Sequence, residues 1–230
     1  MSGIHALLLH GAGGGGWEWN RWCVLLQAHG VRAHAPDLVP AAAGLAATTL
    51  EDYRAQAAAA LAALPRPRVA IGASLGGLLA VLCAADADAL VLVNPIPPAP
   101  WAQRLPARAW PDVVPWRREA RLASTRRALA GADDATALYA FRRWRDESGA
   151  VLRAAHAGVG VARPACPVLC VASSHDTDVP PALTAELAAA WAADLVRVDG
   201  GHVDPLLGRD AVACARLAGD WLRSRIAVAA

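Results

Sequence analysis

A chain of 230 residues, 56% of them apolar, is long enough for one domain with a well-filled core and an insertion. Its formal net charge of +2, carried by 22 arginines against 20 acidic residues, argues against a nucleic-acid-binding protein. No apolar run approaches the roughly 20 residues that a membrane-spanning helix needs, so no membrane partner is expected. The first residues lack the basic start and apolar segment of a signal peptide, which predicts a cytoplasmic protein.

The cysteines argue against a disulfide framework and against a zinc knuckle. There are five of them, an odd number, and no two form a Cys-x-x-Cys pair. We therefore expect free and mostly buried thiols.

Short apolar segments alternate with longer amphipathic ones along most of the chain. Six short segments are predicted as strands, at residues 5–10, 31–35, 68–73, 89–93, 167–172 and 194–198. Helices are predicted at residues 18–29, 50–64, 75–85, 181–191 and 210–224. Near-continuous apolar strands that alternate with helices predict an α/β protein with a doubly wound, mostly parallel six-stranded sheet.

The alternation stops between residues 96 and 163. This segment has six prolines in its first twenty residues, then helical patterns over 116–130 and 133–145, and no clear strand. We predict a mostly helical cap of residues 96–163, inserted into a core of residues 1–95 and 164–230. Ligands of such sheets bind at the carboxyl ends of the strands, which is the side that the cap would cover.

A Gly-x-Ser-x-Gly pattern lies between the third predicted strand and the helix after it. It runs from Gly72 to Gly76, with Ser74 at its centre. In this context the glycines let neighbouring backbone pass close to a serine held in a sharp turn, an arrangement called the nucleophile elbow. The alternative is a glycine-rich loop that contains an incidental serine. The context favours Ser74 as a nucleophile.

A run of glycines, Gly11 to Gly16, follows His10 at the end of the first predicted strand. The backbone amides of Ala12 and Leu75 would form an oxyanion hole, in which one donor typically contributes ~3–4 kcal/mol. The run also matches the Gly-x-Gly-x-x-Gly pattern of a dinucleotide-binding loop. That match is weak by itself, because the acidic residue expected at the end of the next strand follows a proline.

Acidic residues and a histidine follow the last two predicted strands. Asp176 and Asp178 come after the fifth strand, and His202 follows two glycines after the sixth. Because the carboxyl ends of parallel strands meet at one edge of the sheet, we expect His202 and one carboxylate to reach Ser74. Along the chain the order is serine, acid, histidine.

These motifs together resemble those of the α/β-hydrolase superfamily, and the match covers nearly all of the chain. The matching segments are His10-Gly11, Pro36–Leu38, Gly72–Gly76, Asp176–Pro180 and Gly201-His202. The chain starts at what would be the family's third strand, so it resembles a small member that lacks the first two. The family's Asp-x-x-Val-Pro pattern favours Asp176 over Asp178. Asn94 stands at the alternative acid position, and Ser173 stands where many members have glycine.

The resemblance implies a serine hydrolase that acts on an ester or thioester. Ser74 would attack the carbonyl carbon, and His202 would take the serine proton and return it to the leaving group. Asp176 would hold the imidazole in its tautomer, and water would release the acyl group from Ser74. His10 and Gly11 would belong to the substrate-binding loop.

Two other functions on the same fold are kept open. A lyase or cyclase would use Ser74 and His202 for proton transfer without an acyl-enzyme, and a binding protein would need neither residue. Epoxide hydrolases and dehalogenases of this superfamily are disfavoured, because they carry aspartate at the position of Ser74. No metal or organic cofactor is expected, since His175, His202 and Asp204 do not form a ligand cluster at one spacing.

Charge is unevenly distributed between the predicted cap and the core. The cap has twelve arginines and six acidic residues, a net charge of +6, whereas the remainder has ten arginines and fourteen acidic residues, a net charge of −4. A basic cap would attract an anionic acyl substrate, such as a free carboxylate or an acyl group carried by coenzyme A or an acyl carrier protein. The alternative is that the arginines form ordinary solvated helix faces.

Tryptophan supplies most of the aromatic bulk, with nine residues against two tyrosines and one phenylalanine. Trp17 follows the glycine run, and Trp101 and Trp116 lie in the predicted cap. We expect these three indoles to line an apolar substrate pocket; the alternative is that they pack the cap onto the core.

Overall fold

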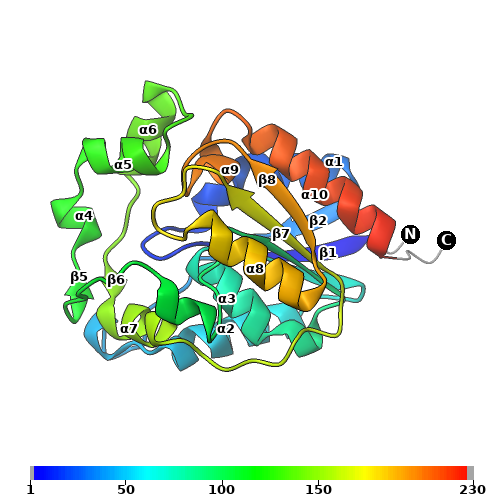
Figure 1. The fold of residues 1–230 in the computed structure, drawn as a ribbon, viewed down its shortest axis with the longest axis horizontal. Helices are drawn as coiled ribbons and strands as arrows, with labels where there is room; N and C mark the ends of the chain where they lie inside the picture. The colour runs from blue at the N-terminus through cyan, green and yellow to red at the C-terminus, as the bar shows by residue number, and fades with distance from the viewer. Residues whose placement is uncertain (1–2, 227–230) are drawn as a thin grey trace.

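The computed structural model describes residues 3–226 and contains a six-stranded parallel sheet (Figure 1). Its strands are β1 (Ile4–Leu9), β2 (Val31–His34), β3 (Arg68–Ala73), β4 (Ala89–Val93), β7 (Val168–Ser173) and β8 (Asp194–Val198). They pair in the order β2-β1-β3-β4-β7-β8, and every pairing is parallel. The six predicted strands and the doubly wound sheet are confirmed, with bounds that differ by at most one residue.

The two faces of the sheet are buried under different helices (Figure 1). One face carries α1 (Asn20–Ala28) and α10 (Ala211–Arg225), and the other carries α2 (Leu50–Ala62), α3 (Leu75–Leu82) and α8 (Pro181–Trp191). Along β1, Leu7 and Leu9 pack into the core under α2 and α3, whereas Ala6 and Leu8 pack under α1 and α10. Burial on both faces is the reason why the strands are near-continuous apolar runs.

The first helix begins later than the sequence predicts. Residues Gly16–Trp19 form a 3₁₀ turn, η1, and α1 starts only at Asn20. The Glu18 N–H donates to the Gly15 carbonyl at 3.0 Å, and the turn buries the side chains of Glu18 and Trp19. The glycine run therefore leads into a tight turn that places a carboxyl group inside the protein.

The segment between β4 and β7 departs most from the prediction. It contains η4 (Trp101–Arg104), β5 (Val113–Val114), α4 (Trp116–Glu119), α5 (Leu122–Ala128), α6 (Asp134–Phe141), β6 (Glu147–Ser148) and α7 (Gly149–Ala157). The single helix predicted over 116–130 is wrong, because extended backbone at Arg121 separates α4 from α5. The expectation of no strand is also wrong, since β5 and β6 pair in antiparallel fashion. In Figure 1 these short elements lie at the end of the molecule away from the start of β1.

The remaining elements are short, namely η2 (Leu45–Ala47), η3 (Ala84–Asp86) and α9 (Asp204–Leu207). Helix α2 begins with a capping box in which Thr49 and Asp52 each accept the other's backbone N–H. Within residues 3–226, no helix combines the length and apolar character that would let it cross a bilayer. All five cysteines are free thiols, three of them buried.

Candidate active site

Ser74 occupies a sharp turn between β3 and α3. Its backbone has φ 53° and ψ −117°, a conformation that non-glycine residues rarely adopt. A Cβ atom at Gly72 would lie 2.1 Å from the Gly76 carbonyl oxygen, and one at Gly76 would lie 2.0 Å from that of Leu9. Both contacts are with backbone, so only glycine fits at these two positions. The motif therefore has the steric properties of a nucleophile elbow.

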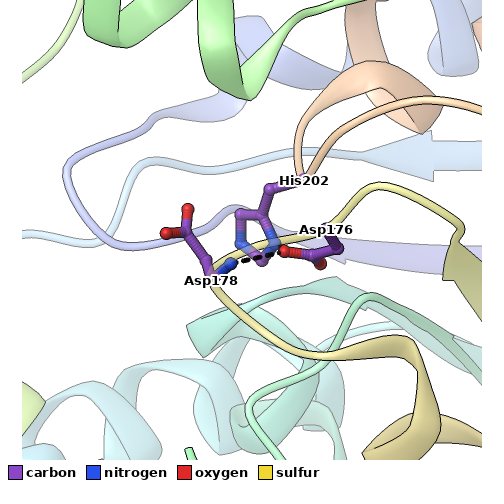
Figure 2. A group of neighbouring side chains, drawn as sticks. All are labelled: Asp176, Asp178 and His202. Atoms are coloured by element: carbon purple, nitrogen blue, oxygen red, sulfur yellow. Dashed lines mark hydrogen bonds and ion pairs between the residues drawn. The ribbon is translucent and has the colours of Figure 1, made fainter. Parts of the chain in front are cut away.

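His202 and Asp176 form a hydrogen-bonded pair at the carboxyl ends of β7 and β8 (Figure 2). His202 Nδ1 lies 2.7 Å from Asp176 Oδ2, and the Asp176 side chain is fully buried. The other carboxylate oxygen, Asp176 Oδ1, accepts the backbone N–H groups of Asp178 at 2.8 Å and Val179 at 2.9 Å. This carboxylate is fully engaged, so it can hold the imidazole in one orientation with Nδ1 as the donor.

The carboxylates around His202 favour its charged form. Burial lowers the pKa of the imidazole, but the charge of Asp176 and its hydrogen bond, together with the charge of Asp178 and that of Glu18 when it is ionised, raise it to about 9. An imidazolium formed when His202 accepts a proton is thus stabilised where it forms. No hydrogen bond joins Ser74 Oγ to His202 in this structure, but both residues line one cavity.

Asn94 supports the loop that carries His202. Its backbone follows β4 with a φ of 43°, and its side chain is buried. The Asn94 amide donates to the His202 carbonyl and to Ser173 Oγ, each at 2.8 Å, and its Oδ1 accepts the Ser173 N–H at 2.8 Å. The two residues that depart from the superfamily pattern, Asn94 and Ser173, are therefore partners of each other.

Three groups that can bind metal ions gather at this place. Ligand atoms of Asp176, Asp178 and His202 lie within 4.8 Å of one another, and Figure 2 shows the imidazole between the two carboxyl groups. Asp178 forms an ion pair with Arg108, and both oxygens of Asp176 are already in hydrogen bonds. This donor set is arranged as a histidine–carboxylate pair with a second carboxylate neutralised by arginine, which does not suit a metal ion.

The other two residues considered as metal ligands lie elsewhere. His175 is exposed, and its Nδ1 lies 3.2 Å from Asp199 at the surface. Asp204 is buried, and its carboxylate accepts the backbone N–H groups of Gly131 and Gly201 at 2.6–3.1 Å. Asp204 thus ties the segment after α5 to the His202 loop.

The predicted oxyanion donors, the N–H groups of Ala12 and Leu75, flank the elbow. Neither has a hydrogen-bond acceptor within residues 3–226, and Leu75 is the first residue of α3. A Cβ atom at Gly11 would lie 3.3 Å from Ser74 Cβ, so the glycine run passes directly beside the serine. Free N–H groups of this kind next to a nucleophile can bind a negatively charged oxygen.

Two charged residues from the segment before β7 hold the middle of the glycine run. The Gly13 N–H donates to Glu147 Oε2 at 2.9 Å, and its carbonyl accepts the Arg145 N–H at 2.7 Å. The Arg145 side chain donates to the Gly14 carbonyl at 2.6 Å. These residues were missed from the sequence, because they lie more than 130 positions from the glycines and match no motif.

His10 supports the same run but does not line the cavity. Burial lowers its pKa to about 4, so the ring is neutral. Its Nδ1 lies 2.8 Å from the Gly11 carbonyl, and Nε2 accepts the Leu38 N–H at 2.9 Å. Arg145 also contacts His10 Nε2, at 3.0 Å. The predicted substrate contact of His10 is thus replaced by an indirect role, in which the ring links the glycine run to the segment after β2.

A cavity of about 440 Å³ contains Ser74 and His202. Its wall includes the indoles of Trp110, Trp116 and Trp144, the basic side chains of Arg108, Arg121, Arg127 and His156, and the carboxyl groups of Glu18 and Asp178. Most of these residues belong to the segment between β4 and β7. The cavity is therefore formed between the sheet edge and that segment.

Of the three tryptophans predicted to line the pocket, the structure places only Trp116 on the cavity wall. Trp17 packs edge-on against Trp144, with ring centroids 5.3 Å apart, and Trp101 packs edge-on against Trp191 at 6.4 Å. For Trp17 and Trp101 the prediction is corrected, because each ring packs the segment between β4 and β7 against the rest of the protein instead, which was the alternative.

Glu18 is a further cavity residue that the sequence analysis did not single out. Its side chain lies on the cavity wall, its Oε2 accepts the Gly11 N–H at 3.2 Å, and the residue is 3% exposed. One signal in the sequence was available, since an acidic residue between two tryptophans, directly after the glycine run, sits in apolar surroundings.

Comparison with known proteins identifies the family to which this fold belongs. A family model described as the alpha/beta hydrolase family matches residues 6–217, which is most of the chain. The chain belongs to the α/β hydrolase family. Members share the fold while their reactions differ, so membership by itself does not name a substrate.

Solved structures of α/β hydrolases resemble the chain over nearly its whole length. Tomato methylketone synthase I bound to 2-tridecanone has a TM-score of 0.76 at 13% identity, covering 98% of this chain and 100% of that one. A pyrethroid hydrolase from Sphingobium faniae JZ-2 has a TM-score of 0.71 at 20% identity, covering 95% and 97%. A methylesterase from Arabidopsis has a TM-score of 0.71 at 14% identity, covering 95% and 98%. A search among curated protein sequences finds no match.

Proposed function

We propose that the protein is a serine hydrolase that cleaves carboxylic esters or thioesters. The observation that carries this proposal is that Ser74, at positive φ in an elbow, shares one cavity with the His202–Asp176 pair. The similar structures of a pyrethroid hydrolase and a methylesterase support this class of reaction.

The reaction follows from the atoms that meet in the cavity. Ser74 Oγ attacks the carbonyl carbon while His202 takes the serine proton, and the N–H groups of Ala12 and Leu75 receive the oxyanion. When the tetrahedral intermediate collapses, the bond to the leaving group breaks and His202 gives that group the proton. Water then attacks the acyl-enzyme by the same route, releasing the acid and restoring the serine. Asp176 keeps His202 in the required tautomer throughout.

The cavity wall supports a small, anionic acyl substrate. Three indoles supply apolar contact, while Arg121 and Arg127 form no ion pair with any carboxylate in residues 3–226. Arg108 is already neutralised by Asp178, so these two guanidinium groups are the ones available to a negative charge. We propose that they bind a carboxylate of the substrate, or phosphate groups of a coenzyme A or carrier-protein thioester outside the cavity.

Covalent labelling tests the proposal. The purified protein is treated with a fluorophosphonate, and its intact mass is compared with that of Ser74→Ala treated alike. We expect one adduct on the wild type and none on the variant. In a separate assay, the unlabelled wild type should turn over members of a panel of matched oxygen esters and acyl-coenzyme A thioesters. A wild type without an adduct and without turnover would contradict hydrolysis and favour proton-transfer chemistry by Ser74 and His202.

A further inference from the structure

Glu18 is a buried carboxyl group that the proposed mechanism leaves without a role. It lies in η1, directly after the glycine run, and forms part of the wall of the cavity that contains Ser74 and His202. Its one hydrogen bond within residues 3–226 is the Gly11 N–H donated to Oε2 at 3.2 Å. The second oxygen, Oε1, has no hydrogen-bond partner within the same residues and remains accessible from the cavity.

The carboxyl group fits into the curve of the glycine run. A Cβ atom at Gly14 would lie 2.4 Å from Glu18 Oε2 and 2.6 Å from Oε1, so the group packs against the backbone of that residue. The Ala12 N–H, which has no acceptor within residues 3–226, follows the Gly11 N–H that holds Oε2. Glu18 is therefore positioned beside the predicted oxyanion hole.

Within residues 3–226, no cation forms an ion pair with Glu18, and its surroundings favour the neutral acid. Burial is the main cause that raises the pKa of Glu18 to about 8, and the charge of Asp37 acts in the same direction. The hydrogen bond from Gly11 and the charges of His202 and Arg145 lower this pKa, but by less. Arg145 is committed to other partners, since its guanidinium contacts the Gly14 and Leu38 carbonyls, His10 and Asp37. At neutral pH, Glu18 thus has an O–H to donate.

We propose that Glu18 is a further catalytic residue, whose uncharged carboxyl group donates its O–H to the reacting ester group beside the Ala12 N–H. This inference rests on the proposed hydrolase function. The proton stays on Glu18 throughout, and the hydrogen bond strengthens as negative charge develops on the substrate oxygen. A carboxylate at this place would repel that charge, so ionisation of Glu18 would stop the reaction.

Three variants test the assignment with a p-nitrophenyl ester as substrate. Glu18→Met keeps the side-chain volume but has no donor, and we expect kcat to fall roughly 100-fold, as for loss of one oxyanion donor. Because this loss is confined to the transition state, KM should stay within about threefold. Glu18→Gln retains an N–H donor, and its kcat at pH 7 should stay within about fivefold of the wild type. Glu51→Gln, on the exposed face of α2, is the matched control.

The pH profile separates catalysis from a merely structural role. Activity requires His202 without its proton and Glu18 with its own, and their pKa values of about 9 and about 8 lie in reverse order. In the wild type, kcat/KM should therefore follow a narrow bell with a maximum near pH 8 to 9. Glu18→Gln should lack the fall, and its kcat/KM should rise to a plateau as His202 loses its proton. Coincident alkaline limbs in the wild type and Glu18→Gln would overturn the proposal, as would an unchanged kcat in Glu18→Met.

Thermal unfolding gives a second readout that needs no activity. The neutral form of a buried acid whose pKa is raised in the folded state stabilises the fold. This contribution is fully present at pH values below the pKa of the unfolded state, and it is lost as pH rises toward the folded-state pKa of about 8. The wild-type melting temperature should therefore fall between pH 6 and 8.5 relative to that of Glu18→Gln; parallel curves would contradict a neutral Glu18. If the wild type is neither labelled at Ser74 nor active, the hydrolase proposal fails. If the wild type is labelled and active, and Glu18→Met has the same kcat, only the proposed role of Glu18 fails.

Discussion

The two N–H groups of the predicted oxyanion hole are held in place by different means. Leu75 follows Ser74 directly, and its position depends on the elbow, which glycines at 72 and 76 make sterically feasible. Ala12 lies in a glycine run whose neighbouring peptide groups are held by Glu18 at Gly11 and, at Gly13 and Gly14, by side chains from distant parts of the chain. One donor is thus fixed by local sequence and the other by tertiary contacts.

The elbow stores strain that its surroundings hold in place. A non-glycine residue at positive φ costs on the order of 1–3 kcal/mol. Four backbone hydrogen bonds surround Ser74: its N–H donates to Val93, and its carbonyl accepts the N–H groups of Gly77, Leu78 and Ile96. Because β3 and α3 are buried on both sides of the turn, the strained conformation has no room to relax.

The glycine run depends instead on charged groups that arrive from elsewhere. The Gly16 N–H donates to Asp37 at 2.7 Å, and the Gly13 N–H donates to Glu147, which also accepts the Tyr53 O–H at 2.9 Å. Glu147 belongs to β6, in the segment between β4 and β7. That segment therefore both lines the cavity and supports the glycine run that carries one donor of the predicted oxyanion hole.

The largest effect is expected from a side chain forced into the elbow. In Gly76→Ala the new Cβ would meet the Leu9 carbonyl oxygen at 2.0 Å, a backbone contact that cannot yield. We expect a destabilisation above about 4 kcal/mol, or no folded protein, measured by urea unfolding. Gly160→Ala is the control, because its Cβ enters open space and should change stability by less than about 0.5 kcal/mol. Similar unfolding midpoints for the two variants would mean that the elbow tolerates a side chain.

The next largest effect is expected from a change of Asp176, the acid proposed to orient His202 toward Ser74. Asp176→Asn keeps the shape of the side chain but disturbs the tautomer of His202, and kcat should fall about 10⁴-fold. Asp178→Asn is the matched control two residues away, and its kcat should stay within about threefold of the wild type, because its carboxylate pairs with Arg108. If steady-state kinetics show the large loss of kcat in Asp178→Asn and the small one in Asp176→Asn, the acid is Asp178.

Removing the support of the glycine run should have an intermediate effect. Glu147→Ala leaves the Gly13 N–H without its acceptor, and the displaced Ala12 N–H should cost roughly 10- to 100-fold in kcat with a small change in KM. Glu186→Gln, an exposed residue paired with Arg104, provides the comparison. If kcat of Glu147→Ala matches that of this control, the run holds its shape without the distant carboxylate.

The smallest effect should appear in the pH dependence of Asp178→Asn. Asp178 is one of the carboxylates that raise the pKa of His202 to about 9, so removing its charge favours the neutral imidazole. The rising limb of kcat/KM should move to lower pH by a few tenths of a pH unit, as expected for a partly exposed charge. A limb that stays in place, or moves to higher pH, would show that Asp178 does not act on His202 through its charge.

The six strands, the parallel sheet and the elbow could be predicted from the sequence because each depends on neighbouring residues. Apolar runs buried on both faces indicate parallel strands, and Gly72, Ser74 and Gly76 lie within five positions. The same is true of His202 and Asp176 as strand-end residues. Their hydrogen bond is seen only in the structure, yet both positions follow from where β7 and β8 end.

Tertiary structure alone decided the rest of the site. Strands β5 and β6 have two residues each, too few for a periodic pattern, and their pairing joins residues more than thirty positions apart. Whether an indole lines the cavity depends on where the surrounding chain places it, as Trp116, which lines it, and Trp17, which does not, show. The reach of Glu147 to Gly13 likewise follows from long-range packing, which no local pattern encodes. For the burial of Glu18, the two flanking tryptophans were the one signal in the sequence.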